Sequence, residues 1–189
     1  MKFPLFRRRA RADTISTLYG TIVAQARLPV FYREYAVPDT VNGRFDLLVL
    51  HLALVLGRMQ ADAQLRDIGQ ALFDHFCTDM DRNLREMGVG DLSVPKHMQR
   101  VGEAYYGRAQ AYRAALAPDD QKGLIEALKR NIYSNVAGGD AVTRLAAYVR
   151  ETVGELREQS AANLLAGVLR LPNPGATVFV EVEASSAKD

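Results

Sequence analysis

Apolar residues recur along this chain at the three- and four-residue spacing that is typical of amphipathic helices. One apolar face begins after Asp13 and runs to Ala26. The segment Phe45–Met59 is apolar on nearly all sides, which predicts a helix in the centre of the core. Asp39 or Thr40 is placed to cap that central helix.

Further helices are predicted downstream of the central one. The pattern places them at residues 62–87, 93–116, 118–132 and from 140 to 156, the last extending toward residue 169. Gly88 is a natural helix stop, and Ser93 is expected to cap the helix that carries Pro95 in its first turn. The proline-bounded segment 28–38 is predicted to be a connector whose aromatic side chains lie across the domain.

These elements predict an all-α protein with a single globular domain of about six to seven helices. The domain is expected to span residues 13–170, after a basic N-terminal arm at residues 1–12. Residues 171–189 are expected to form an irregular C-terminal tail that is either disordered or docked. Residues 177–183 alternate as a strand does, but no second strand signal accompanies them, so a stable sheet is not expected.

The composition narrows the class of protein. Among 189 residues, 48% are hydrophobic and 24% are charged, so the chain can bury a core and stay soluble. The single cysteine, Cys77, cannot form an internal disulfide, which favours a reducing compartment. The net charge of +2 is too small for a protein coated in nucleic acid. The longest apolar run, residues 47–57, is too short to span a membrane.

The N-terminal arm carries its own candidate function. Each basic side chain contributes about 1 kcal/mol near an anionic lipid surface, and neighbouring aromatic rings can enter the interface. The same cations could bind ribosomal RNA phosphates, or the arm could bind nothing. The candidate contact residues are Lys2, Phe3, Phe6, Arg7, Arg8, Arg9 and Arg11.

Catalytic and metal-binding chemistry is sparse in this sequence. His75 and Cys77 are two residues apart, so on a helix they point in different directions and cannot share an ion. His75 with Asp79 offers only two ligands, and the exposed helix face is the simpler interpretation. His51 is expected to be an interior histidine whose nitrogens are hydrogen-bonded. We therefore predict no catalytic residue, no metal site, no cofactor and no enzymatic activity.

Two long stretches carry a family resemblance. Residues 79–96 read DMDRNLREMGVGDLSVPK and are followed by Tyr105-Tyr106, and residues 25–59 read QARLPVFYREYAVPDTVNGRFDLLVLHLALVLGRM. Over residues 14–150 the chain resembles the ubiquinol–cytochrome c chaperone family. The resemblance implies a non-enzymatic, all-helical assembly factor for respiratory complex III, the ubiquinol–cytochrome c oxidoreductase.

The resemblance also implies partners and a location. The expected client is newly made cytochrome b, held at the inner membrane surface and near the ribosomal tunnel exit, with a small helical protein as a further candidate partner. The short segment before the domain favours a bacterial member, cytoplasmic and peripherally associated with the inner membrane. DNA is not an expected partner. A monomer is expected because no heptad pattern is sustained.

The predicted partner-binding surface lies on the third and fourth helices. Methionines adapt to irregular surfaces, tyrosines make amphipathic contacts, and charged side chains would form a rim. The residues are Asp79, Met80, Arg82, Arg85, Met87, Asp91, Leu92, Pro95, Lys96, Met98, Tyr105 and Tyr106. Two structural alternatives stand beside this prediction: Met80 and Met87 pack inside, and Arg85 clamps Asp91 to fix the loop. The alternative function is a ribosome- or nucleic-acid-associated module that binds through the N-terminal arm.

Overall fold

The computed structural model describes residues 4–116, 120–134 and 139–176. This part of the chain contains eight helices and no strand, which confirms the all-α prediction. The helices are α1 (Pro4–Ala26), α2 (Pro29–Arg33), α3 (Val41–Gln60), α4 (Arg66–Glu86), α5 (Val94–Ala115), α6 (Gln121–Asn131), α7 (Asp140–Glu158) and α8 (Ala161–Leu165).

Helix α3 lies at the centre of the fold, as its apolar pattern predicts. It packs against α1, α4, α5 and α7, and most of its side chains are buried. Thr40 is the cap of this helix, since its hydroxyl accepts the backbone N–H of Gly43 at 3.1 Å. A Cβ on Gly43 would lie 2.0 Å from the carbonyl oxygen of Pro38, so only glycine permits this entry to the helix.

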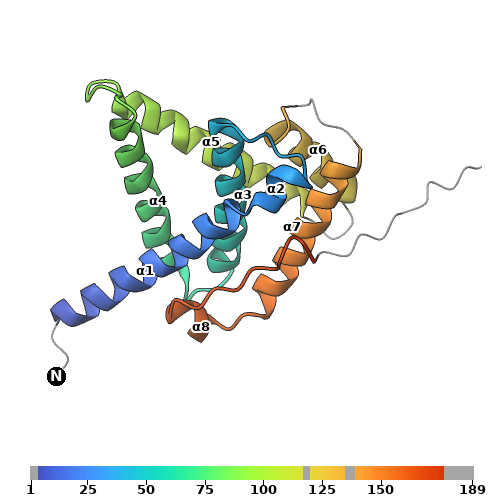
Figure 1. Ribbon diagram of the computed structural model, residues 1–189. Helices are drawn as coiled ribbons and strands as arrows, with labels where there is room; N and C mark the ends of the chain where they lie inside the picture. Colours follow the sequence, from blue (N-terminus) through green and yellow to red (C-terminus); the bar gives the residue numbers. More distant parts are fainter. Residues whose placement is uncertain (1–3, 117–119, 135–138, 177–189) are drawn as a thin grey trace, which may run out of the picture.

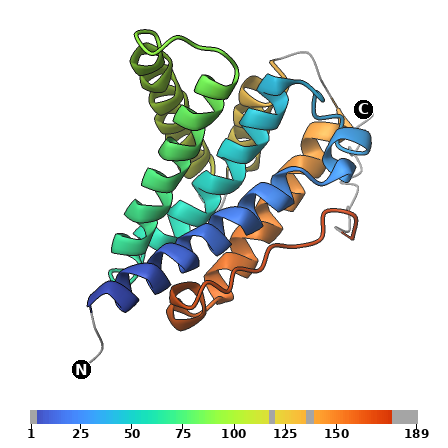
Figure 2. The ribbon, with the colours of Figure 1, turned by 60° about the vertical axis from the view of Figure 1, so that its left-hand side comes forward.

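The outer helices form two groups on different sides of α3. Helix α1 packs on α3 and α4, while α6 packs on α5 and α7 at the other side of the body. Figure 1 shows α4 and α5 leaving the body to meet at a corner, far from α7 and α8. The turned view in Figure 2 shows the same corner standing above α1.

The N-terminal boundary of the first helix differs from the prediction. Helix α1 begins at Pro4 and not near Asp13, so the basic residues from Arg7 to Arg11 belong to a continuous helix. Arginine is a good helix former, and this run contains no glycine and no proline to stop the helix. The connector after α1 also contains a short helix, α2, whose Phe31 is fully buried.

Other helix boundaries and caps also differ from the prediction, including the start of α4 at Arg66 in place of residue 62. Helix α7 stops at Glu158 because the amide of Gln159 bonds the backbone of Arg170, donating to its carbonyl and accepting its N–H, both at 2.8 Å. Ser93 occupies the cap position of α5, but its side chain makes no capping hydrogen bond. Asp120 caps α6 directly, accepting from Gly123 at 2.7 Å, while Pro118 lies outside the described residues.

The first residues of the predicted C-terminal tail are docked on the body. Gln25 of α1 donates to the carbonyl of Pro172 at 2.7 Å, and the Tyr35 hydroxyl donates to that of Pro174 at 2.6 Å. Both prolines are buried. The strand-like segment 177–183 and the last residues lie outside the described part of the chain.

Candidate functional site

The corner between α4 and α5, residues 79–106, contains the residues that the sequence analysis selects. Gly88 adopts a φ of +84°, a left-handed conformation that suits glycine. Its N–H bonds the carbonyl of Arg85, and the N–H of Val89 reaches back to Leu84, both at 3.0 Å. This pair of bonds closes the end of α4 as a Schellman motif, so the predicted stop at Gly88 is confirmed.

Ion pairs between side chains of α4 and of the loop hold the corner in shape. Arg85 donates to Asp81 at 2.8 Å one turn away and also pairs with Asp91 in the loop. Arg82 donates to Asp79 at 2.5 Å. The clamp between Arg85 and Asp91 is therefore present, and it fixes the loop between the two helices.

The apolar side chains of the corner divide into buried and exposed groups. Met80 is half-buried and packs against the core, which confirms the structural alternative at that position. Met87 is 67% exposed, so the prediction that it packs inside is wrong, because it lies beyond the last turn that faces the body. Leu92 is fully exposed at 100%. Met98 is half-buried, and Pro95 and Lys96 are exposed.

The two tyrosines of the signature have different environments. Tyr105 is buried, its ring centroid lies 4.7 Å from that of Phe73, and burial raises the pKa of its hydroxyl to about 12. Tyr106 is 63% exposed, with its ring 5.6 Å from Phe73. Tyr106 is therefore available to a partner, whereas the buried Tyr105 packs against its ring, with centroids 5.3 Å apart.

Asp79 connects the corner to the body. Its carboxylate accepts the hydroxyl of Tyr19 at 2.9 Å and the amide of Asn83 at 3.3 Å, in addition to Arg82. Burial and the Asp79 hydrogen bond raise the pKa of Tyr19, which keeps the hydroxyl protonated as a donor. Most of the hydrogen-bonding capacity of Asp79 is thus used within the protein.

His51 is the satisfied interior histidine that the sequence predicts. Its Nδ1 lies 2.8 Å from the carbonyl oxygen of Leu47, which can only accept, so Nδ1 donates. Nε2 then accepts the hydroxyl of Tyr148 at 2.9 Å, and Gln25 donates to that hydroxyl oxygen at 2.9 Å. Burial lowers the pKa of His51 to about 4. The centroids of the His51 and Phe31 rings lie 5.4 Å apart, with the rings edge-on to each other. The contacts of His51 are therefore structural.

Within the described residues, no three His, Cys, Asp or Glu side chains gather closely enough to hold a metal ion. His75, half of the two-ligand pair considered above, is half-buried, with its ring edge-on to Tyr19 at 5.0 Å. In the same part of the chain, no helix has the length and apolar character needed to cross a membrane.

The predicted lipid or RNA contacts lie at the start of α1. Arg9 and Arg11 are exposed, and the guanidinium of Arg11 donates to the backbone carbonyl of Asp67 at 2.8 Å. Lys2 and Phe3 lie outside the described residues, and the side chains of Phe6, Arg7 and Arg8 are not among those described. Their role as contacts stays a prediction.

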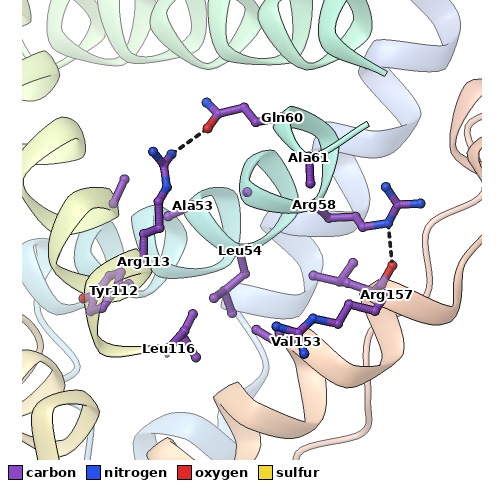
Figure 3. Close-up of a pocket in the computed structure, with 13 residues that line it drawn as sticks. Ala53, Leu54, Arg58, Gln60, Ala61, Tyr112, Arg113, Leu116, Val153 and Arg157 are labelled. Carbon is purple, nitrogen blue, oxygen red and sulfur yellow. Dashed lines mark hydrogen bonds between the residues drawn. The ribbon is translucent and has the colours of Figure 1, made fainter. Parts of the chain in front are cut away.

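Sequence reasoning misses a groove between α3, α5 and α7. Its volume is about 590 Å³, and α5 and α7 form its walls (Figure 3). On the side of α3, the lining includes three small residues, Ala53, Gly57 and Ala61, which alternate with larger ones such as Leu54 and Arg58. Their spacing of four is visible in the sequence and could have indicated an open helix face.

Comparison with known proteins identifies the family to which this chain belongs. A family model described as "Ubiquinol-cytochrome C chaperone" matches residues 33–171. The chain therefore belongs to the ubiquinol–cytochrome c chaperone family, and the resemblance noted from residues 79–96 is confirmed.

Particular relatives agree with this assignment. The chain is 25% identical over 150 residues to "Ubiquinol-cytochrome c reductase complex assembly factor 1" of Mus musculus and of Homo sapiens, covering 78% of this chain. It spans about half the length of those two relatives, 50% in each case. A solved structure, "Crystal structure of the Cbp3 homolog from Brucella abortus", is 38% identical, with a TM-score of 0.85, and the match covers 94% of this chain and 100% of that one.

Proposed function

We propose that this chain is a non-enzymatic assembly chaperone that binds newly synthesised cytochrome b and supports biogenesis of the ubiquinol–cytochrome c oxidoreductase. Membership of the chaperone family supports the class of function. The observation that carries the binding site is the pair of exposed apolar side chains, Met87 and Leu92, at the corner between α4 and α5. Apolar side chains exposed together at one corner can contact the apolar segments of a membrane-protein client.

The corner combines adaptable contacts with a fixed frame. Met87 can follow an irregular apolar surface, and Tyr106 adds an amphipathic ring beside Phe73. The clamp between Arg85 and Asp91 holds the loop, so the corner loses little entropy when a client binds. The remaining residues of the predicted rim, including Lys96, would keep the unoccupied corner soluble.

The membrane part of the proposal concerns the start of α1. Arg9 and Arg11 are exposed there, and cations of this kind favour an anionic leaflet. We place the protein, as a monomer, in the cytoplasm and peripherally at the inner membrane, close to ribosomes that make cytochrome b, with a small helical protein as a further candidate partner.

The test uses the host organism. Deleting the gene and recording the reduced-minus-oxidised haem spectrum of isolated membranes should show selective loss of the b-type signal, restored by the wild-type gene. A Met87→Ser, Leu92→Ser double variant should restore little of it. Val41→Ser is the matched control, because Val41 is also exposed, at 71%, but lies on α3. An unchanged spectrum after deletion would contradict the proposal.

A ribosome- or nucleic-acid-associated module is the second candidate function, favoured by the exposed arginines of α1. Replacing Arg7, Arg8 and Arg9 with glutamine leaves the Arg11 bond to α4 in place. Under this second function the variant should lose all activity, whereas under the chaperone proposal it should only bind membranes less tightly. A variant that still protects cytochrome b excludes the second candidate as the main function.

A further inference from the structure

The groove between α3, α5 and α7 differs in chemistry from the α4–α5 corner. Ala53, Gly57 and Ala61 follow one another at the base of the groove, and a Cβ added to Gly57 would meet no atom within 4 Å, so α3 is open at this point. Leu54, Leu116 and Val153 contribute apolar surface from three different helices. Small residues on a helix face allow a second helix to approach closely.

The charged side chains that line the groove are all positive. Its lining, made entirely of described residues, contains Arg58, Arg113 and Arg157 and no carboxylate. Arg58 is used internally: it donates to the carbonyls of Leu156 and Gln159, each at 3.0 Å, and lies 3.6 Å from Asp62.

In contrast to Arg58, the other two arginines of the lining have no acidic partner among the described residues. Among the described residues, Arg113 donates to the neutral side-chain amide of Gln60 at 2.5 Å, and neither Arg113 nor the exposed Arg157 forms an ion pair. Figure 3 shows these two arginines on separate walls, Arg113 on α5 and Arg157 on α7.

We propose that this groove binds an amphipathic helix of a partner protein, with its apolar face on α3 and acidic side chains along both flanks. The placement of the two arginines favours a helix over a lipid, because a lipid carries its negative charge at one end whereas a helix can carry carboxylates on both sides. The small residues of the floor extend over about 12 Å, or roughly two helical turns. This site is separate from the α4–α5 corner and does not rest on the proposed function.

The experiment measures binding of two synthetic peptides to the full chain by fluorescence anisotropy. Both are helical, about 18 residues long, and share one Leu/Ala face, but one is flanked by glutamate and the other by lysine. We expect the glutamate peptide to bind about tenfold more tightly. The doubly reversed variant Arg113→Glu, Arg157→Glu should invert this preference, which a merely structural role of the arginines would not produce.

A substitution that fills the groove tests whether the peptide binds there. Gly57→Leu should weaken binding of the glutamate peptide about tenfold or more, since the leucine occupies the floor. Gly20→Leu is the matched control, because Gly20 is also in a helix with no atom within 4 Å of an added Cβ, and it should bind as wild type does. Circular dichroism confirms that both variants are folded.

Several results would overturn the proposal. Equal affinity for the two peptides would remove the charge argument, and unaltered binding to Gly57→Leu would place the peptide elsewhere. Sedimentation showing a dimer that Gly57→Leu dissociates would assign the groove to a second copy of this chain. A co-purified lipid whose amount falls in Gly57→Leu would assign it to a lipid.

Discussion

The α4–α5 corner and the centre of the body are stabilised by different forces. At the corner, exposed ion pairs around Arg85 and the turn at Gly88 fix the backbone, while Leu92 projects into solvent. In the body, buried rings pack around Phe31, and a directional chain of hydrogen bonds passes through His51. Surface residues of the corner can therefore change without loss of the fold, whereas residues of the body cannot.

The largest effect is expected in the body. Phe31→Ala should lower the free energy of unfolding by about 3–5 kcal/mol, because it leaves a cavity between the rings of Tyr35 and Tyr148. Tyr106→Ala is the corresponding change at the corner and should cost less than about 1 kcal/mol, since that ring is 63% exposed. Urea unfolding followed by circular dichroism measures both. Equal losses would contradict the contrast between the two regions.

The second prediction concerns pH and the two buried titratable groups of α3. Burial lowers the pKa of His51 to about 4. As pH falls below 6.5, His51 is protonated in the unfolded chain and stays neutral in the folded protein, so the free energy of unfolding decreases. Burial raises the pKa of Asp46 to about 6 against the influence of its partner Arg108, so the folded protein takes up that proton first and gains stability. The two contributions oppose each other between pH 6.5 and 4.

Variants separate these contributions. Asp46→Asn should lose about 1.5 kcal/mol of stability between pH 6.5 and 5 through His51 alone. His51→Gln should instead become more stable over the same interval, through Asp46. The wild type should change less than either variant. Urea titrations at the two pH values measure this, and parallel pH profiles for all three proteins would refute the assignment.

A smaller effect is expected at the turn of the corner. Gly88→Ala should cost about 1 kcal/mol, since alanine disfavours a φ of +84°. Gly102→Ala provides the control, because Gly102 lies within α5 with open space at its Cβ and should gain stability slightly. Hydrogen exchange of the amides in residues 84–96 should accelerate only in the Gly88 variant.

The smallest effect is expected from removing the exposed ion pairs of Arg85 at the corner. Arg85→Ala should lower stability by less than about 1 kcal/mol, because the side chain and both partners are exposed to solvent. The loss should shrink when NaCl is raised from about 0.05 M to about 0.5 M, since salt screens exposed pairs. A loss independent of salt would show that Arg85 acts by packing.

Sequence patterns predict those parts of this protein whose causes are local. Helix α3 is recognisable because it is apolar on nearly all sides, and Gly88 because a helix end needs a left-handed residue. The pairing of Arg85 with Asp91 is inferable because the two residues are close in sequence on either side of a turn.

Features that depend on distant segments were not predictable in this way. The end of α7 is set by Gln159 and Arg170, a pairing with no local signal. The groove requires α3, α5 and α7 to be placed together, and only the spacing of Ala53, Gly57 and Ala61 hints at it. The apolar pattern also does not indicate the start of α1, because a run of arginines has no apolar periodicity, although arginine favours helix.

The docking of the segment at Pro172–Pro174 has a consequence for the timing of folding during translation. Gln25 and Tyr35 leave the ribosome early, whereas the carbonyls they bind are 147 and 139 residues further along the chain. Because a ribosome delivers the amino terminus first, these bonds form only after residues 172–174 have been made. Gln25 also donates to Tyr148, so the same side chain joins this segment to the hydrogen-bonded chain through His51. The two segments therefore join only after most of the helical body has been made, and a ribosome that stops before Pro172 releases a chain in which Gln25 and Tyr35 lack these acceptors.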